Sequence, residues 1–252
     1  MSDVLFRMNL FSKEIAEELS CCSRYEESHK DILIVVRNQL DYLKKCIHSI
    51  QSYTKNFKIF IWDNGSDIET KEWLSQQKDF FVISNPENIG FIIPNNELAK
   101  HGNSEYIILL NSDTEVLPNW DSAMISQIQQ KKYAQVGYLG GELDSDGKGK
   151  VFKFGSDLDY ICGWCFCIPR SIYQKYGLFD QENLIFAYCE DSDFSLRLKD
   201  NGEKIYALHL GLVIHHENKT IKTVMKEMDC KLSFERNHKF IKKRWKHKFS
   251  DG

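Results

Sequence analysis

The fold is decided by the stretch Tyr106-Ile107-Ile108-Leu109-Leu110-Asn111-Ser112-Asp113-Thr114-Glu115-Val116. Its first five residues are apolar and rich in β-branched side chains, which is typical of a strand buried on both faces of a sheet. The polar residues that follow cannot lie in that core, so we expect them at the strand's carboxyl end, where open α/β sheets bind ligands. Asp113, beside the oxygen-bearing Asn111 and Ser112, suits a divalent cation that carries phosphate oxygens. The same residues are also compatible with a turn that caps the next helix.

The composition indicates a globular protein. The chain has 252 residues, of which 42% are hydrophobic and 27% charged, enough for one large domain with appendages. A net charge of -3 gives no indication of a nucleic-acid partner. The sequence shows neither an apolar run of about 20 residues nor the layout of a secretory signal, so we expect a cytoplasmic location. The eight cysteines are then expected to be reduced thiols.

Strands and helices alternate through the first half of the chain. Helical spacing of apolar residues follows the first strand, and Pro94 is expected to open the helix after the third strand. Such alternation with short connections predicts a parallel, twisted sheet covered on both faces. The four expected strands cover residues 32–36, 57–62, 80–83 and 106–110.

The second half and the two ends are less regular. Residues 4–19 have the spacing of an added helix, and residues 20–30 have the composition of a linker. Residues 219–248 hold eleven Lys or Arg against three acidic residues, with apolar residues at helical spacing. Between these ends we expect a helix at 190–198 and strands at 136–139, 161–168, 204–208 and 212–214, the last two closing the sheet.

Three further polar clusters carry chemistry. Asp63, after the second strand, can accept a hydrogen bond from a nucleobase N–H, although Asn64-Gly65 is also a common turn dipeptide. The cluster Glu190-Asp191-Ser192-Asp193 can supply a base for an attacking hydroxyl, or it can cap the helix that it begins. The apolar run 184–188 before it would exclude water.

His215 and His216 follow the last expected strand. Adjacent residues of an extended segment point to opposite sides, so at most one of the two imidazoles faces a given site. That imidazole could be a ligand for Mn²⁺ or Mg²⁺, or it could be structural. The cysteines at positions 162, 165 and 167 lack the spacing of a zinc site, and we expect them in a buried strand.

Four motifs stand in the order found in one enzyme family. They are similar to the family's Val-Val-Asp-Asn-Gly-Ser, Asn-Pro-Glu-Asn-x-Gly-Phe, Leu-Asn-x-Asp-Thr-Glu-Val and Gly-Glu-Asp-x-Asp-Leu-x-x-Arg, and they occupy residues 61–66, 85–91, 110–116 and 189–197. The chain therefore resembles the inverting family-2 glycosyltransferases of the GT-A fold over roughly residues 31 to 245. Arg236-Asn237-His238 is similar to the C-terminal helix of the rhamnosyltransferase-like members.

The resemblance implies an α/β fold of the GT-A type, with three α/β/α layers around a mostly parallel central sheet and added N- and C-terminal helices. Residues 1–30 would be a helical extension and linker, residues 31–218 the catalytic domain, and residues 219–252 basic C-terminal helices. Within the catalytic domain, residues 31–116 would bind the nucleotide and residues 117–218 the acceptor.

The resemblance also assigns roles. Asp191 would be the general base, with Glu190 as its competitor, and Asp113 and His215 would hold Mn²⁺ or Mg²⁺ on the diphosphate. Gly163 and Trp164 would lie on the acceptor side. The nucleotide-sugar, of UDP or dTDP type, would be bound by Val36, Asn38, Asp63, Asn64, Asn88, Asn95, Asn111 and Ser112. A hydroxyl of a glycan or lipid-linked glycan would attack in a single displacement with inversion.

The chain departs from the family pattern in three places. The first strand runs into the short loop Val36-Arg37-Asn38 rather than Thr-Tyr-Asn, which puts that loop's base and ribose contacts in doubt. Asn95-Asn96 replaces an Arg-Asn pair and so removes a phosphate contact. Asn111 replaces the first acid of the Asp-x-Asp signature, so metal dependence could be weaker than in the family.

Two other functions are compatible with the sequence. A nucleotidyltransferase would have a Gly-rich basic loop after the first strand, where this chain has Arg37-Asn38-Gln39. A non-catalytic module that binds nucleotide sugars or other anions would use Asp113 and Asp191 only as helix caps. The basic segment 219–248 either contacts an anionic membrane as a peripheral helix or packs its apolar face on the domain.

Overall fold

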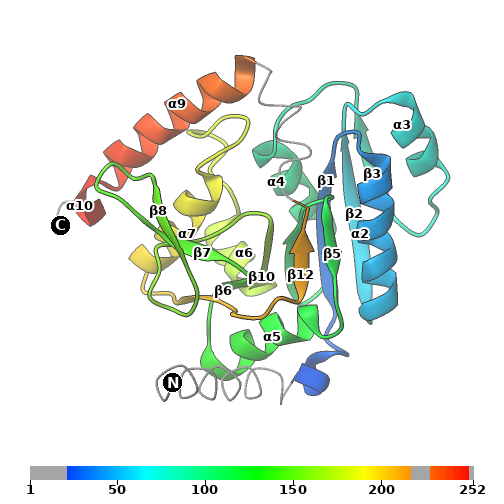
Figure 1. Cartoon of the computed structure of the whole chain (residues 1–252), viewed down its shortest axis with the longest axis horizontal. Coiled ribbons are helices and arrows are strands. Elements are labelled where there is room, and N and C mark those ends of the chain that lie inside the picture. The colour runs from blue at the N-terminus through cyan, green and yellow to red at the C-terminus, as the bar shows by residue number, and fades with distance from the viewer. Residues whose placement is uncertain (1–21, 217–227, 250–252) are drawn as a thin grey trace, which may run out of the picture.

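The computed structural model describes residues 22–216 and 228–249. A seven-stranded sheet forms its centre, in the strand order β11-β6-β10-β4-β1-β2-β3. The edge formed by β1, β2 and β3 lies on the right in Figure 1. Neighbouring strands run parallel except for β10, which is antiparallel to β4 and β6. The strands are β1 (Lys30–Val36), β2 (Phe57–Asn64), β3 (Phe81–Asn85), β4 (Tyr106–Leu110), β6 (Gln135–Gly137), β10 (Cys165–Pro169) and β11 (Ile205–Ala207). The expected mostly parallel sheet is confirmed.

Helices cover both faces of this sheet because its strands are apolar on both sides. Alternate residues of β1 enter different cores: Ile32 and Ile34 join one hydrophobic cluster, and Leu33 joins the other. The first cluster packs against α2 (Leu40–Tyr53), α3 (Ile68–Ser75) and α5 (Trp120–Lys131). The second packs against α4 (Ile92–His101), α6 (Arg170–Tyr176), α7 (Glu190–Asp200) and α9 (Met228–Arg244). This is the three-layer α/β/α arrangement.

The last expected strand lies outside the main sheet. We predicted that residues 212–214 close that sheet, but β12 (Val213–His215) pairs antiparallel with β5 (Thr114–Val116) in a separate two-stranded ribbon. The edge position beside β6 belongs to β11 instead. A three-residue apolar segment fits either partner, and only the tertiary path of the chain decides between them.

Two element boundaries also differ from the prediction. The expected strand at 161–168 is divided at Gly163 into β9 (Tyr160–Ile161) and β10, and β9 joins a small sheet with β7 (Gly140–Leu143) and β8 (Gly149–Lys153). Helix α4 begins at Ile92, two residues before Pro94. Pro94 is tolerated there because the first N–H groups of a helix have no partner inside the helix.

The ends of the chain are described only in part. The expected helix at 4–19 lies outside the described residues. In the expected linker, Cys22–Tyr25 forms a 3₁₀ helix, η1, and β1 begins at Lys30. Within residues 22–216 and 228–249, no helix combines the length and hydropathy that a membrane span requires.

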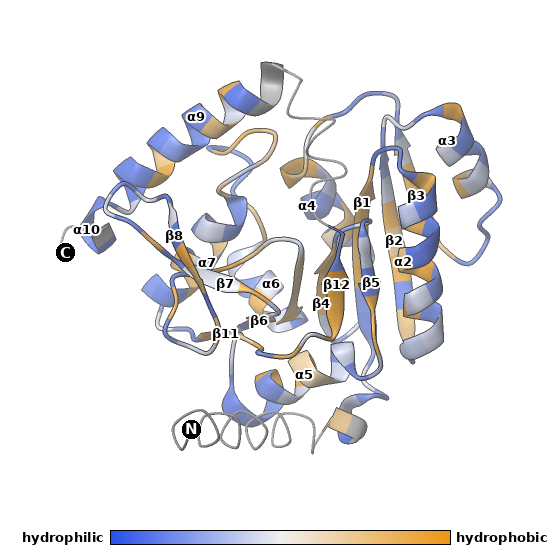
Figure 2. Ribbon diagram, viewed as in Figure 1, coloured by the Kyte–Doolittle hydropathy of each residue, from blue (hydrophilic) through white to orange (hydrophobic). Residues whose placement is uncertain are grey.

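The C-terminal helix α9, followed by the short α10 (Lys246–Phe249), packs on the domain. Ile241 and Trp245 are buried in the second core cluster, whereas Lys239, Lys242 and Lys243 are exposed. Hydrophilic residues accordingly dominate α9 in Figure 2. The end of the helix therefore packs on the domain, whereas Leu232 and Phe234 nearer its start are 56% and 42% exposed, so each of the two interpretations of the basic segment fits part of the described helix.

A buried ion pair joins the start of β1 to α5 and provides a test of the fold. The Lys30 ammonium is fully buried 2.5 Å from Asp121 Oδ2, and it also donates to the Glu26 carbonyl. Asp121→Asn leaves this charge without its counterion, so we expect the free energy of unfolding to fall by about 3–5 kcal/mol. Urea denaturation measures the change.

The matched control is Lys55→Met. Its ammonium contacts Glu26 and Glu27, but the side chain is 60% exposed. Exposed pairs contribute about 0–1 kcal/mol. Equal losses in the two variants would show that burial does not set the strength of the Lys30–Asp121 pair.

Candidate active site

A pocket of about 420 Å³ lies at the carboxyl ends of β1, β2 and β4. This is where a sheet of mostly parallel strands is expected to bind its ligand. Ten of the fourteen site residues predicted from the sequence line it: Asn64, Asn88, Asn111, Ser112, Asp113, Gly163, Trp164, Glu190, Asp191 and His215. The other four, Val36, Asn38, Asp63 and Asn95, do not line it.

Asp113 and His215 form the candidate metal site. The β5–β12 ribbon pairs Thr114 with His215, and the His215 Nε2 atom lies 3.2 Å from Asp113 Oδ1. Trp164 stacks on the His215 ring with centroids 5.1 Å apart and so fixes its orientation. His216 instead contacts Glu115, its Nε2 atom lying 2.6 Å from the carboxylate. Only the first of the two adjacent imidazoles lines the pocket.

The donor set fits a divalent cation that is shared with a phosphate ligand. A carboxylate oxygen and an imidazole nitrogen 3.2 Å apart can contact one ion together. Within the described ranges, no group of three or more His, Cys, Asp or Glu side chains is arranged as a metal site. Diphosphate oxygens and water would supply the remaining ligands, as Mg²⁺ sites commonly require.

Asp191 and Glu190 begin α7 and line the same pocket. Asp191 accepts hydrogen bonds from the backbone N–H groups of Gly163 at 3.0 Å and Ser192 at 2.7 Å, and from the Ser192 hydroxyl at 3.2 Å. Burial raises the pKa of Asp191, but these three donors oppose that shift by stabilising its carboxylate. Asp191 is therefore the better placed of the two to act as a base.

Glu190 has the opposite environment. It is 7% exposed, and its Oε2 atom is buried without a hydrogen-bond partner in the described part of the chain. Burial raises the pKa of Glu190 well above its ordinary value, and the charge of Asp191 raises it further. Two neighbouring carboxyl groups with such different surroundings divide naturally into one that ionises and one that keeps its proton.

Asp63 and Asn64 order the loop that follows β2 and join it to the loop that follows β3. Asp63 is fully buried, and its Oδ1 atom accepts from the Ser66 N–H, while Oδ2 has no partner within the described ranges. Asn64 donates to Asn88 and to the Gly90 carbonyl. Hydrogen bonds thus order this loop, and the buried Asp63 Oδ2 atom can still accept one.

The other three predicted residues outside the pocket lining are Val36, Asn38 and Asn95, and they contribute to the structure around the pocket. Asn38 accepts from the Asp67 N–H, and its own N–H donates to the Ser66 hydroxyl. Val36 is fully buried in the first core cluster. Asn95 is 1% exposed and donates to the Phe91 carbonyl. The side chains of Val36 and Asn95 are therefore placed to shape the pocket's surroundings rather than to touch a ligand in it.

The sequence analysis assigned no site residue to the loop 185–189, although this loop forms a wall of the pocket. Phe186, Tyr188 and Cys189 adopt left-handed backbone conformations with φ of 59°, 77° and 68°. The Phe186 carbonyl accepts from the N–H groups of Phe91 and Ile92. One signal was available: Cys189 stands where the family motif has glycine, the residue that adopts positive φ without strain.

Solved structures of similar shape show the class of fold. The chain aligns with GalNAc-T7 in complex with UDP, GalNAc and Mn²⁺ (TM-score 0.62, 17% identity, 72% of this chain and 42% of that one). It also aligns with the mannosyltransferase PcManGT from Pyrobaculum calidifontis in complex with GDP-Man and Mn²⁺ (0.60, 10%, 82% and 68%) and with S. aureus TarS 1-349 (0.59, 13%, 79% and 63%). The fold is the GT-A fold of glycosyltransferases.

The chain belongs to glycosyl transferase family 2, whose sequence model matches residues 31–185. It is 24% identical over 238 residues to the O-antigen biosynthesis protein RfbC of Myxococcus xanthus, covering 81% of this chain but only 18% of that relative. It is 24% identical over 227 residues to the rhamnosyltransferase WbbL of Escherichia coli K12, covering 75% of this chain and 85% of that relative. The family resemblance inferred from the four motifs is confirmed.

The environment of Glu190 predicts how stability depends on pH. The folded protein keeps the Glu190 proton to a higher pH than the unfolded chain, whose glutamates titrate near pH 4.3. The folded state therefore binds more protons above that pH, and its stability falls as the pH rises. Glu190→Gln removes this titration, so we expect the melting temperature of the variant to fall less between about pH 5 and pH 8 than that of the wild type.

Thermal unfolding followed by circular dichroism measures both curves. Each unit of pKa shift corresponds to about 1.4 kcal/mol, so the difference should be resolvable. Glu72→Gln, at an exposed position of α3, is the control and should follow the wild type. Parallel curves for Glu190→Gln and the wild type would contradict the raised pKa.

Proposed function

We propose that this protein transfers a hexosyl group from a nucleoside diphosphate sugar, of the UDP or dTDP type, to a hydroxyl of a glycan acceptor with inversion. The observation that carries the proposal is that the Asp113–His215 pair and the Asp191–Glu190 pair line one pocket. A metal-diphosphate site and a base for a hydroxyl are the two functions that a single displacement requires.

Each residue then has one task. Asp191 accepts the proton of the acceptor hydroxyl while that oxygen forms a bond to the anomeric carbon. The bond from this carbon to the diphosphate oxygen breaks at the same time, so the configuration inverts and no covalent enzyme intermediate forms. Asp113 and His215 would hold Mn²⁺ or Mg²⁺, which supplies Lewis-acid stabilisation of the leaving diphosphate.

Glu190 and the nucleotide side complete the proposal. A protonated Glu190 leaves Asp191 as the ionised member of the pair, so the two carboxyl groups do not compete for the acceptor proton. Asp63 does not line the pocket, but its buried Oδ2 atom has no hydrogen-bond partner within the described ranges, and we assign it the base N–H of the nucleotide. Asn64, Asn88, Asn111 and Ser112, which line the pocket, would surround the donor. Gly163 and Trp164 would meet the acceptor.

The relatives narrow the acceptor class. WbbL is named a rhamnosyltransferase and RfbC an O-antigen biosynthesis protein, which supports a glycan or lipid-linked glycan as acceptor. The exposed lysines of α9, together with the exposed Leu232 and Phe234, are compatible with peripheral contact to an anionic membrane on the cytoplasmic side. The alternative is a non-catalytic module that binds nucleotide sugars.

The donor and the metal are tested first by calorimetric titration. We expect one of the UDP-, dTDP- or GDP-sugars to bind in the presence of Mn²⁺, and Asp113→Ala to weaken that binding about tenfold or more because it removes a metal ligand. Asp157→Ala is the matched control, since its side chain is fully exposed outside the pocket. If no nucleotide sugar binds with or without metal, the transferase proposal fails.

The rate of sugar transfer tests the role of Asp191 as the base. Asp191→Asn keeps the shape of the side chain but cannot accept the proton, so we expect transfer to slow by about 10²–10⁴-fold. The donor dissociation constant should stay unchanged. Glu190→Gln should slow transfer less, because a neutral amide resembles the protonated acid. A rate that collapses in Glu190→Gln and survives in Asp191→Asn would exchange the two roles.

A further inference from the structure

The C-terminal helix α9 contacts the catalytic part of the chain at two polar sites. It lies beyond residues 31–185, the part matched by the family model. One contact is between Asn237 and the pocket loop 185–188, and the other is between the end of the helix and Asp193 of α7. Both contacts reach the segment that carries Asp191.

Asn237 binds the backbone of the loop. The residue is fully buried, and its Oδ1 atom accepts from the Ile185 N–H at 3.0 Å. Its Nδ2 group lies within hydrogen-bond distance of the carbonyls of Ile185 at 2.8 Å, Ala187 at 3.0 Å and Tyr188 at 3.0 Å. One side chain thus contacts four backbone polar groups of the loop. Phe234, one turn earlier, packs edge-on against Tyr188.

The loop needs such support because its backbone is in a disfavoured conformation. Phe186, Tyr188 and Cys189 all have positive φ, which residues with a Cβ rarely adopt. Such conformations persist only where the surrounding structure fixes them. On the other side of the loop, Gly90 packs so closely that a Cβ there would lie 2.3 Å from the Phe186 carbonyl oxygen. The loop is therefore held between the Gly90 turn and Asn237.

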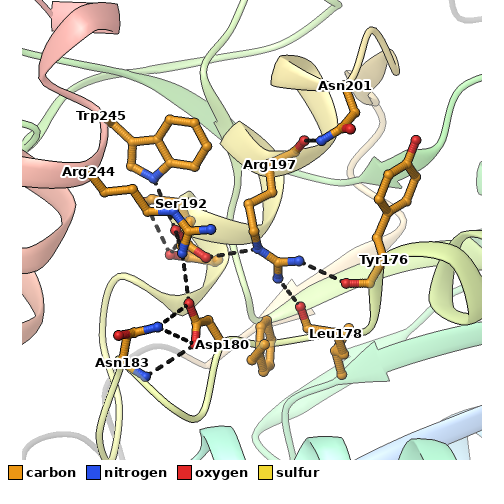
Figure 3. Close-up of polar contacts among 12 residues, drawn as sticks. Tyr176, Leu178, Asp180, Asn183, Ser192, Arg197, Asn201, Arg244 and Trp245 are labelled. Atoms are coloured by element: carbon orange, nitrogen blue, oxygen red, sulfur yellow. Dashed lines mark hydrogen bonds and ion pairs between the residues drawn. The ribbon is translucent and has the colours of Figure 1, made fainter.

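The second contact fixes α7 itself. The Trp245 indole donates to Asp193 Oδ1 at 3.0 Å, and Arg197 Nε donates to Asp193 Oδ2 at 2.9 Å. Arg244 bonds Asp180 Oδ2 at 2.7 Å and lies 3.4 Å from Asp193 (Figure 3). Asp193 is fully buried two residues after Asp191. The end of α9 is therefore joined to the first turn of the helix that carries the proposed base.

We propose that α9 is a brace for the acceptor side of the active site and that Asn237 is its positioning residue. Asn237 holds the loop 185–188 so that Phe186 and Tyr188 line the pocket and α7 begins with Asp191 facing it. The reaction it serves is the proposed transfer, so this inference rests on the proposed function. On the donor side, Asp113 pairs with His215 and His215 stacks on Trp164, so we expect that side to be independent of α9.

Asn237→Ala tests the brace. We expect acceptor-dependent transfer to slow about tenfold or more, whereas the donor dissociation constant with Mn²⁺ changes less than about twofold. We also expect the Ile185 amide to lose its protection from hydrogen exchange, because its acceptor is removed. Ile241→Val is the matched control, since it loosens the packing of the same helix and keeps the hydrogen bonds of Asn237.

A rescue separates positioning from general stability. Cys189→Gly places at φ 68° a residue that accepts positive φ freely. In the background of Asn237→Ala, it should restore transfer by about threefold or more, because the loop then needs less support. A structural role without positioning predicts no rescue. Should Asn237→Ala fail to fold, Trp245→Phe, which removes the indole N–H bond to Asp193 together with part of the buried ring, should slow transfer without weakening donor binding.

The outcomes distinguish this inference from the proposed function. If the wild type binds no nucleotide sugar, the proposed function fails, while exchange at Ile185 still reports whether Asn237 holds the loop. The brace is overturned if Asn237→Ala leaves that exchange unchanged. It is also overturned if Asn237→Ala and Ile241→Val slow transfer equally, or if donor affinity falls in parallel with the transfer rate.

Discussion

The candidate site depends on the pairing of two short strands. β5 and β12 are three residues each, yet their pairing brings His215 beside Asp113 from about a hundred residues away in the chain. Backbone bonds continue the ladder at both ends, from Leu117 to Leu212 and from His216 to Asp113. The Thr114 hydroxyl, which donates to the Asn111 carbonyl, fixes the turn between the buried strand β4 and this ribbon. A shift of one residue in this register would turn the imidazole away from the pocket, since successive side chains alternate.

A second long-range contact holds the proposed base, Asp191, beside the chain between β9 and β10. The Gly163 N–H that binds Asp191 is available because β9 and β10 are separated at that point. A continuous strand from 160 to 169 would direct backbone donors into a ladder rather than toward a side chain. The break therefore stabilises an ionised carboxyl group in a buried place where burial alone would hold its proton, as it does for Glu190.

The features readable from the sequence are those fixed by local pattern. Buried strands 32–36, 57–62 and 106–110 have apolar runs that end in polar clusters, and β1, β2 and β4 contain them. The positions of Asp113 and Asp191 at strand and helix ends follow from the same pattern. The partner of β12 and the role of Asn237 were not readable, because each is decided by contacts with residues 50 to 100 positions away. The positive φ angles of Phe186 and Tyr188 could not be predicted from these residue types either, since both rarely adopt such a conformation.

The buried carboxylate of Asp193 explains why the proposed base and the C-terminal helix form one unit. A carboxylate with no exposed surface requires counterions and donors, and it has Arg197 on its own helix together with Trp245 and Arg244 from α9 and its end. Separating α9 from α7 would remove Trp245 and Arg244 from the Asp193 carboxylate. Breaking a buried pair typically costs about 3–5 kcal/mol. The match to the family model ends at residue 185, before α7 and α9 begin. The residues after the end of that match thus carry both the proposed base and the interactions that hold it in place.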